Sequence, residues 1–252
     1  MKIKKHIPNL LTLGNLFSGT VAAIFAVQSN FEAAALLVVI GIFFDFLDGF
    51  VARLLKVSGE LGTQLDSLAD MVTSGVVPGI IMFNLLSENS AITYFSDSYE
   101  TSSFDGFHLE LFPLLGLLLT LGACYRLAKF NIDTRQTDSF IGLPTPAMCL
   151  FVVSLPLILQ YSEVDFAQNL IENSYFLVLI TLVLTYLMNA EIPLFSLKFK
   201  EYSIKKNLVK YLFLLISLQM IIGLKYLSIP LIIILYVVFS FFNNKQTEEI
   251  KE

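Results

Sequence analysis

The stretch FFDFLDGFVARLLKVSGELGTQLDSLADMV, from Phe43 to Val72, determines the fold class of the chain. It closes one long apolar run and opens the next, and the short polar segment KVSGELG stands between them. An apolar run of about 20 residues has the length of a helix that crosses a bilayer. The stretch therefore predicts the end of one membrane-spanning helix, a tight turn and the start of a second helix.

The rest of the chain has the composition of a polytopic membrane protein. Of its 252 residues, 56% are hydrophobic and 15% are charged, whereas soluble domains have about 25% charged residues. Eight apolar blocks are candidate spans: about 8–28, 31–54, 67–86, 109–130, 146–161, 173–190, 207–224 and 227–242. The last two are separated only by Gly223-Leu224-Lys225, so a re-entrant hairpin would also fit.

These blocks predict an all-α integral membrane protein, a helical bundle of about eight transmembrane helices. We expect a single membrane-embedded domain over residues 1–252, with a core of about 7–190 and accessory spans of about 207–242.

The basic residues indicate how this bundle is oriented. With the N-terminus in the cytoplasm, eight spans place every Lys and Arg except Lys225 on the cytoplasmic side. The positive-inside rule favours this arrangement, which puts the C-terminus in the cytoplasm as well. The loop 87–108 has acids but no Lys or Arg and falls outside. We therefore expect a multi-pass protein of the cytoplasmic membrane whose polar stretch faces the cytoplasm. The net charge of -5 indicates no nucleic-acid partner.

Four aspartates lie in the opening stretch, although a carboxylate near a bilayer is costly unless it is paired, solvated or bound to a metal. One arc of about 140° on the first helix carries Asp45, Asp48, Gly49, Ala52 and Arg53. The next helix repeats the pattern at intervals of four residues, with Gly62, Asp66 and Asp70. If the two helices pack side by side in antiparallel orientation, their aspartate-bearing faces would meet.

Carboxylates that converge within a few ångströms do not all stay ionised without cations. Hard divalent ions prefer oxygen ligands, so Mg²⁺, Mn²⁺ and Ca²⁺ all qualify. Two such ions about 3.5–4 Å apart suit phosphoryl chemistry. On the same helix face, the small residues Gly49 and Ala52 leave space for a ligand, and Arg53 can bind phosphate through two nitrogens.

Two other interpretations of the aspartates are open. A solvated acidic turn could simply end two helices, but the glycines and the alanine on the same faces weaken this interpretation. An ion pathway in a transporter or channel is the second. All four aspartates stand at one membrane face, and no acidic residue halfway through another span continues such a path.

At this spacing the chain resembles the CDP-alcohol phosphatidyltransferases. Their signature is present at every fixed position as Asp45-x-x-Asp48-Gly49-x-x-Ala52-Arg53, then eight residues, then Gly62-x-x-x-Asp66-x-x-x-Asp70. The segments IPNLLTLGNLFSG (7–19) and RLAKFNIDTRQTDSFIGLPTPA (126–147) are similar to the serine-dependent branch of bacteria and archaea. The resemblance extends over about residues 7 to 150.

The resemblance implies an enzyme that transfers the phosphatidyl group from CDP-diacylglycerol to L-serine, giving phosphatidylserine and CMP. It implies that Asp45, Asp48, Asp66 and Asp70 hold two divalent ions, Mg²⁺ or Mn²⁺, and that Asp70 is the general base. The residues expected on the side of the CDP group and its diphosphate are Gly49, Ala52, Arg53, Gly62, Asn9 and Thr12. A homodimer is the oligomeric state that the resemblance suggests.

An acceptor such as serine brings a carboxylate and an ammonium group to the membrane edge. The residues expected to bind it are Arg126, Lys129, Asn131, Arg135, Pro144 and Thr145. Lys129 and Arg135 would equally fit as cytoplasmic anchors under the positive-inside rule. A sibling enzyme that uses glycerol 3-phosphate or an inositol phosphate is the alternative, because the same basic cluster could hold a phosphate.

Overall fold

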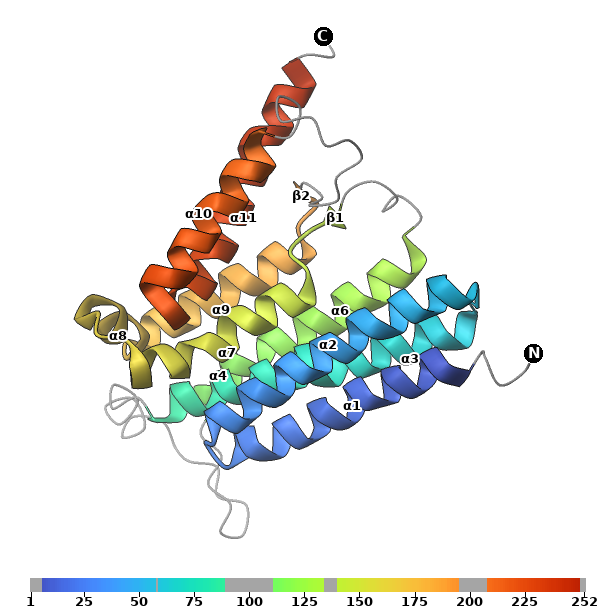
Figure 1. Ribbon diagram of the computed structural model, residues 1–252. Coiled ribbons are helices and arrows are strands. Elements are labelled where there is room, and N and C mark those ends of the chain that lie inside the picture. The colour runs from blue at the N-terminus through green and yellow to red at the C-terminus, as the bar shows by residue number, and fades with distance from the viewer. Residues whose placement is uncertain (1–5, 58, 89–110, 134–139, 195–207, 250–252) are drawn as a thin grey trace.

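The computed structural model describes residues 6–57, 59–88, 111–133, 140–194 and 208–249, and these are almost entirely helical (Figure 1). The helices are α1 (His6–Val27), α2 (Phe31–Leu55), α3 (Glu60–Asp70), the π-helix η2 (Met71–Val76), α4 (Val77–Glu88), the 3₁₀ helix η4 (Pro113–Leu117), α6 (Leu118–Ile132), α7 (Thr145–Tyr161), α8 (Asp165–Ile171), α9 (Ser174–Asn189), α10 (Leu208–Leu224), the 3₁₀ helix η5 (Lys225–Leu227) and α11 (Ser228–Glu249). The strands β1 (Phe140–Ile141) and β2 (Pro193–Leu194) form a short antiparallel ribbon.

Several of these helices have the length and composition of membrane spans. Among the described residues five segments qualify: His6–Val27, Phe31–Leu55, Glu60–Glu88, Pro113–Ile132 and Lys210–Phe241. A sixth results if α8 and α9, which are bent by 78° relative to each other, form one span. The helical architecture is thus confirmed, and these helices fit a multi-pass membrane protein. Length and composition alone support five or six spans rather than eight, because α7 has only 17 residues and 210–241 count as one run.

The run from Lys210 to Phe241 is folded back on itself at η5, so that α10 and α11 lie side by side (Figure 1). The ring of Phe213 in α10 lies 5.9 Å from that of Tyr236 and 6.4 Å from that of Phe239 in α11. Lys225 has a positive φ of 49° at the reversal. The break after Gly223 therefore separates two antiparallel helices.

The ends of α2 are set by local signals. The side chain of Asn30 accepts a hydrogen bond from the backbone N–H of Ala33, at 3.2 Å, and so caps the first turn. At the other end Lys56 adopts the left-handed conformation that closes a helix. These signals end α2 shortly after Asp48, where the chain turns into α3.

The helix from Glu60 to Glu88 is continuous but widens to a π turn directly after Asp70. Pro78 has no N–H to give to the carbonyl four residues earlier, and a wider turn accommodates this loss. The hydroxyl of Thr120 in α6 donates to the carbonyl oxygen of Gly75 in this turn, at 2.9 Å. The π turn rotates the residues that follow Asp70 relative to the face that carries Asp66.

The buried apolar side chains form one cluster that extends over α1, α2, α4, α6, α7, α8 and α9. Helix α7 supplies the largest share, including Met148, Val152 and Ile158, none of which is exposed. This cluster fixes the helices whose ends carry the aspartates and the basic residues, and those ends lie on one side of the molecule (Figure 1).

Candidate active site

Three of the four aspartates meet where α2 ends and α3 begins. Asp45 and Asp48 come from the last turns of α2 and Asp66 comes from α3, and one carboxylate oxygen of each lies within 4.8 Å of the others. Asp48 is buried and the other two are half-buried. Three carboxylates at such separations repel one another unless a cation lies between them. The donor set therefore fits a hard divalent ion.

Asp70 lies beside these three rather than within the group. Its Oδ1 accepts a hydrogen bond from Nδ2 of Asn15 in α1, at 3.1 Å. Its charge interacts with those of Asp45, Asp48 and Asp66 and with that of Arg126. Asp70 thus interacts electrostatically with both the carboxylate group and the basic end of α6.

Asn15 was not among the predicted site residues, although it is fully buried and contacts Asp70 directly. Its Oδ1 accepts a hydrogen bond of 2.7 Å from the hydroxyl of Thr73, which is also fully buried. An amide whose oxygen is held in this way presents its NH₂ group to Asp70. The signal in the sequence was the i, i+3 spacing of Asn9, Thr12 and Asn15, which places three polar residues on one face of an apolar helix.

Thr73 occupies a narrow space between α1 and α2. A Cβ added to Gly19 would lie 2.1 Å from Oγ1 of Thr73, and one added to Gly41 would lie 2.8 Å from its Cγ2. Only glycine at these two positions lets α1 and α2 approach the π turn this closely. The space left by these two glycines accommodates Thr73, whose hydroxyl donates a hydrogen bond to Asn15.

The two residues of α1 predicted for the nucleotide side, Asn9 and Thr12, both lie beside the aspartate-bearing helices. The hydroxyl of Thr12 donates to Oδ2 of Asp48 at 2.5 Å and is buried. Asn9 faces α3, because a Cβ added to Gly62 would lie 3.5 Å from Oδ1 of Asn9. Helix α1 therefore forms a third wall of the site, next to α2 and α3.

The small residues of α2 leave its backbone accessible. Apart from its own helix, no atom of the described residues lies within 4 Å of the place where a Cβ on Gly49 would stand. Ala52 on the same face is half-buried, and Arg53 is exposed. Arg53 donates from Nε to the carbonyl oxygen of Gly49, at 3.0 Å. A ligand can thus approach this face of α2 next to a guanidinium group.

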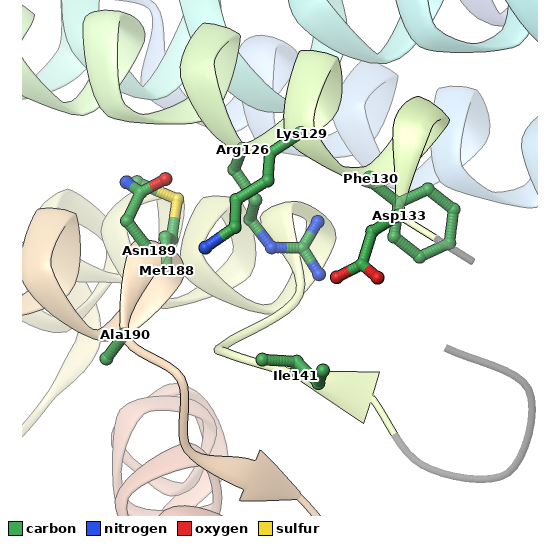
Figure 2. A pocket seen from close by; sticks show the side chains of 8 residues that line it. All are labelled: Arg126, Lys129, Phe130, Asp133, Ile141, Met188, Asn189 and Ala190. Atoms are coloured by element: carbon green, nitrogen blue, oxygen red, sulfur yellow. The ribbon is translucent and has the colours of Figure 1, made fainter. Parts of the chain in front are cut away.

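The basic end of α6 faces a small pocket, shown in Figure 2. Arg126 is only 8% exposed, and its guanidinium lies 5.9 Å from the centre of the Phe130 ring. Lys129 forms an ion pair of 3.3 Å with Glu191. The pocket is lined by Arg126, Lys129, Phe130, Asp133, Ile141, Met188, Asn189 and Ala190.

The other residues predicted for the acceptor do not line this pocket, as far as the described part of the chain shows. Nδ2 of Asn131 donates to Oγ of Ser67 at 2.9 Å, which ties α6 to the helix of Asp66. Pro144 precedes α7, and Thr145 is buried in its first turn. Arg135 lies outside the described residues.

Comparison with known proteins gives consistent matches. The model of the family described as CDP-alcohol phosphatidyltransferase matches residues 5–188. The CDP-diacylglycerol–serine O-phosphatidyltransferase of Bacillus subtilis (strain 168) is 34% identical over 155 residues, which are 59% of this chain and 75% of the relative. The protein of the same name from Helicobacter pylori (strain J99) is 32% identical over 216 residues, or 85% of this chain and 80% of the relative.

An archaeal protein is similar to this chain as well. The archaetidylserine synthase of Methanothermobacter thermautotrophicus is 29% identical over 175 residues, covering 68% of this chain and 66% of the relative. The family match spans more than half of the chain and includes the helices that carry all four aspartates. The chain therefore belongs to the CDP-alcohol phosphatidyltransferase family.

Proposed function

We propose that this chain transfers the phosphatidyl group from CDP-diacylglycerol to the hydroxyl of L-serine, giving phosphatidylserine and CMP. The observation that carries the proposal is the meeting of Asp45, Asp48 and Asp66 within 4.8 Å, next to Asp70. The bacterial relatives named for this reaction support serine as the acceptor.

The carboxylates of Asp45, Asp48, Asp66 and Asp70 are the ligands for divalent cations, with two Mg²⁺ or Mn²⁺ ions as the first candidates and Ca²⁺ as a further one. Bound divalent ions neutralise a diphosphate and the charge that develops on its leaving group. The hydrogen bond from Thr12 to Asp48 orients one of these carboxylates, as neighbours of metal ligands commonly do.

Asp70 acts as the general base in this mechanism. It takes the proton of the serine hydroxyl while the serine oxygen forms a bond to the phosphorus of the phosphatidyl group. The bond from that phosphorus to the CMP oxygen breaks, and its electron pair leaves with CMP. The amide of Asn15 orients Asp70 for the transfer, since it is held by Thr73 from behind.

The substrates lie on opposite sides of Asp70. The CDP group and its diphosphate are bound by Asn9, Thr12, Gly49, Ala52, Arg53 and Gly62. Serine is bound by Arg126 and Lys129, with Asn131, Arg135, Pro144 and Thr145 completing the surroundings of the acceptor. The interaction of Asp70 with Arg126 supports this division, because it links the base to the acceptor side.

The proposed membrane arrangement has eight crossings, with both termini and the active site at the cytoplasmic face of the cytoplasmic membrane. The reversal at η5 supports two separate crossings by α10 and α11. The 17 residues of α7 extend over about 26 Å, close to the hydrophobic thickness of about 30 Å. Residues of about 7–190 form the catalytic core of a single domain, the hairpin of about 207–242 is accessory, and the chain forms a homodimer.

The test of the function is CMP release from CDP-diacylglycerol by the detergent-purified protein with Mn²⁺ or Mg²⁺. L-serine, glycerol 3-phosphate and an inositol phosphate are offered separately. We expect release with serine alone and its loss on addition of EDTA. Release with another acceptor would keep the chemistry and refute serine, and no release with any acceptor would favour the ion-transport interpretation.

A further inference from the structure

One face of the last two turns of α6 carries charges of both signs. Arg126, Lys129 and Phe130 stand at positions i, i+3 and i+4 and therefore share a face, and Asp133 follows as the residue that ends the helix. All four line the pocket of Figure 2, in which the guanidinium of Arg126 lies between the amine of Lys129 and the carboxylate of Asp133. The opposite wall is the end of α9, from Met188 to Ala190.

Arg126 provides a buried donor without an acceptor. The residue is 8% exposed, and its Nε has no hydrogen-bond partner in the described part of the chain. A buried cation with an unused N–H is costly unless an anion completes its contacts. The guanidinium of Arg126 also interacts electrostatically with the carboxylate of Asp70, which is the proposed base.

Asn189 provides a buried acceptor on the opposite wall. Its Nδ2 donates to the carbonyl oxygens of Gly122 and Thr185, at 3.2 and 3.0 Å. These two bonds fix the orientation of the amide, because its oxygen would be repelled by the same carbonyls. Oδ1 is buried, and no described residue donates to it.

The end of α9 adds to the negative character of this wall. A helix carries partial negative charge at its carboxyl end, where cations are favoured. The last residues of α9, Met188 and Asn189, line the pocket directly. The wall formed by Asn189 and the end of α9 thus suits a cation, whereas Arg126 suits an anion.

We propose that this pocket binds the acceptor through both charges of an α-amino acid. Arg126 contacts the carboxylate, and Oδ1 of Asn189 together with Asp133 contacts the ammonium group. The inference rests on the proposed function and adds Asn189 and Asp133 as specificity-determining residues outside the family signature. The cavity volume of about 10 Å³ has room for one water-sized group, so the rest of the acceptor lies at the open side of the pocket.

The same two-sided charge disfavours acceptors that carry a phosphate. The second cation of the pocket, Lys129, is already paired with Glu191 at 3.3 Å. A dianion next to Arg126 would also stand near the carboxylate of Asp133 and the negative end of α9, and like charges repel at short range. The pocket therefore selects a zwitterion over glycerol 3-phosphate or an inositol phosphate.

The first test is steady-state kinetics of the full-length Asn189→Leu enzyme. Loss of a hydrogen bond to a charged group predicts a rise of about 10- to 100-fold in the KM for L-serine. The inhibition constant of L-alanine, which has both charges but no hydroxyl, rises in parallel, while kcat and the KM for CDP-diacylglycerol stay within about twofold. A purely structural defect would lower kcat and affect both substrates. The matched control is Tyr186→Leu, an exposed position of α9, which leaves all four constants unchanged.

The second test does not depend on how Asn189→Leu folds. Asp133→Asn raises the KM for serine and lowers the inhibition constant of glycerol 3-phosphate about fivefold or more, because it removes a repulsive charge. An unchanged serine KM in both variants, or an unchanged glycerol 3-phosphate constant in Asp133→Asn, overturns the two-charge pocket. Wild-type enzyme that releases no CMP with serine would instead refute the proposed function.

Discussion

The carboxylates of the site differ in their contacts, and the proposed roles rest on this difference. Asp48 accepts a hydrogen bond from Thr12 and belongs to the group of three whose oxygens lie within 4.8 Å of one another. Asp70 stands beside this group, accepts a hydrogen bond from Asn15 and interacts electrostatically with Arg126. A carboxylate placed toward the acceptor side is positioned to take a proton from it, which is why Asp70 is the proposed base.

Substituting Asp70 by Asn tests this role. The amide has nearly the same shape but does not accept a proton, so we expect turnover to be abolished while CDP-diacylglycerol binding is largely retained. CMP release and lipid-nucleotide binding are measured on the same preparation. Loss of binding in parallel with activity would make Asp70 essential as a metal ligand instead. Asp165→Asn, an exposed change in α8, is the control and leaves both quantities unchanged.

Substituting Thr73 by Val tests the hydrogen bonds that orient Asp70. Valine keeps the shape but leaves Oδ1 of Asn15 without its donor, and an unsatisfied buried acceptor costs about 1–3 kcal/mol. We expect kcat to fall about tenfold or more, with a smaller change in the KM for either substrate. Thr73→Ser keeps the hydroxyl and should restore most of the rate. A serine variant as slow as the valine variant would show that the hydroxyl is not what matters.

Among the elements, the π turn after Asp70 explains how three helices come close enough to build the site. It displaces Thr73 into the space beside α1 and α2, where Gly19 and Gly41 leave room for it. Wide turns inside helices are common at functional sites, because they re-aim side chains without ending the helix. Here the redirected side chain is that of Thr73, whose hydroxyl donates a hydrogen bond to Asn15.

Gly19→Ala and Gly223→Ala compare a crowded glycine with an open one. A Cβ at Gly19 would lie 2.8 Å from the backbone Cα of Thr73, whereas outside its own helix none of the atoms that the structure describes lies within 4 Å of one at Gly223. Overpacking costs about 1–3 kcal/mol, and alanine is favoured over glycine in a helix by about 1 kcal/mol. We expect Gly19→Ala to lower the melting temperature in detergent and Gly223→Ala to keep or raise it. Equal melting temperatures would contradict the tight packing of α1 against the π turn.

At the scale of the whole molecule, the charged residues are unevenly distributed between the two ends of the bundle. The aspartates and the basic end of α6 gather at one end of the bundle, and Lys225 lies at the reversal between α10 and α11. Basic residues are retained on the cytoplasmic side during insertion. The site would therefore meet soluble serine from the cytoplasm and lipid from the bilayer.

Single-cysteine labelling tests this orientation. In a background with Cys124 and Cys149 replaced by alanine, Lys225→Cys and Lys251→Cys are exposed in turn to a membrane-impermeant thiol reagent on intact cells. We expect Lys225→Cys to react and Lys251→Cys to react only after permeabilisation. Reaction of both in intact cells would place both positions on the outer face and show that α11 does not cross the membrane, and the reverse pattern would invert the topology.

The sequence by itself determined the helical membrane class, the family and the faces that carry the aspartates. A bilayer demands that each backbone segment satisfy its own hydrogen bonds, so long apolar runs leave little choice but helices. Helical periodicity then assigns Asp45 and Asp48 to one face and Asp66 and Asp70 to another without knowledge of neighbours. These constraints are local, which is why they were visible before the fold.

Only the tertiary structure decided which partners those faces meet. The contacts of Asn15 with Asp70, of Thr73 with Asn15 and of Asn189 with Gly122 join residues far apart in the chain. Periodicity does not say how a helix is rotated against its neighbours, where a π turn shifts its register, or that the chain reverses at η5. Those features depend on packing between helices, where close approach and buried hydrogen bonds select one arrangement among many.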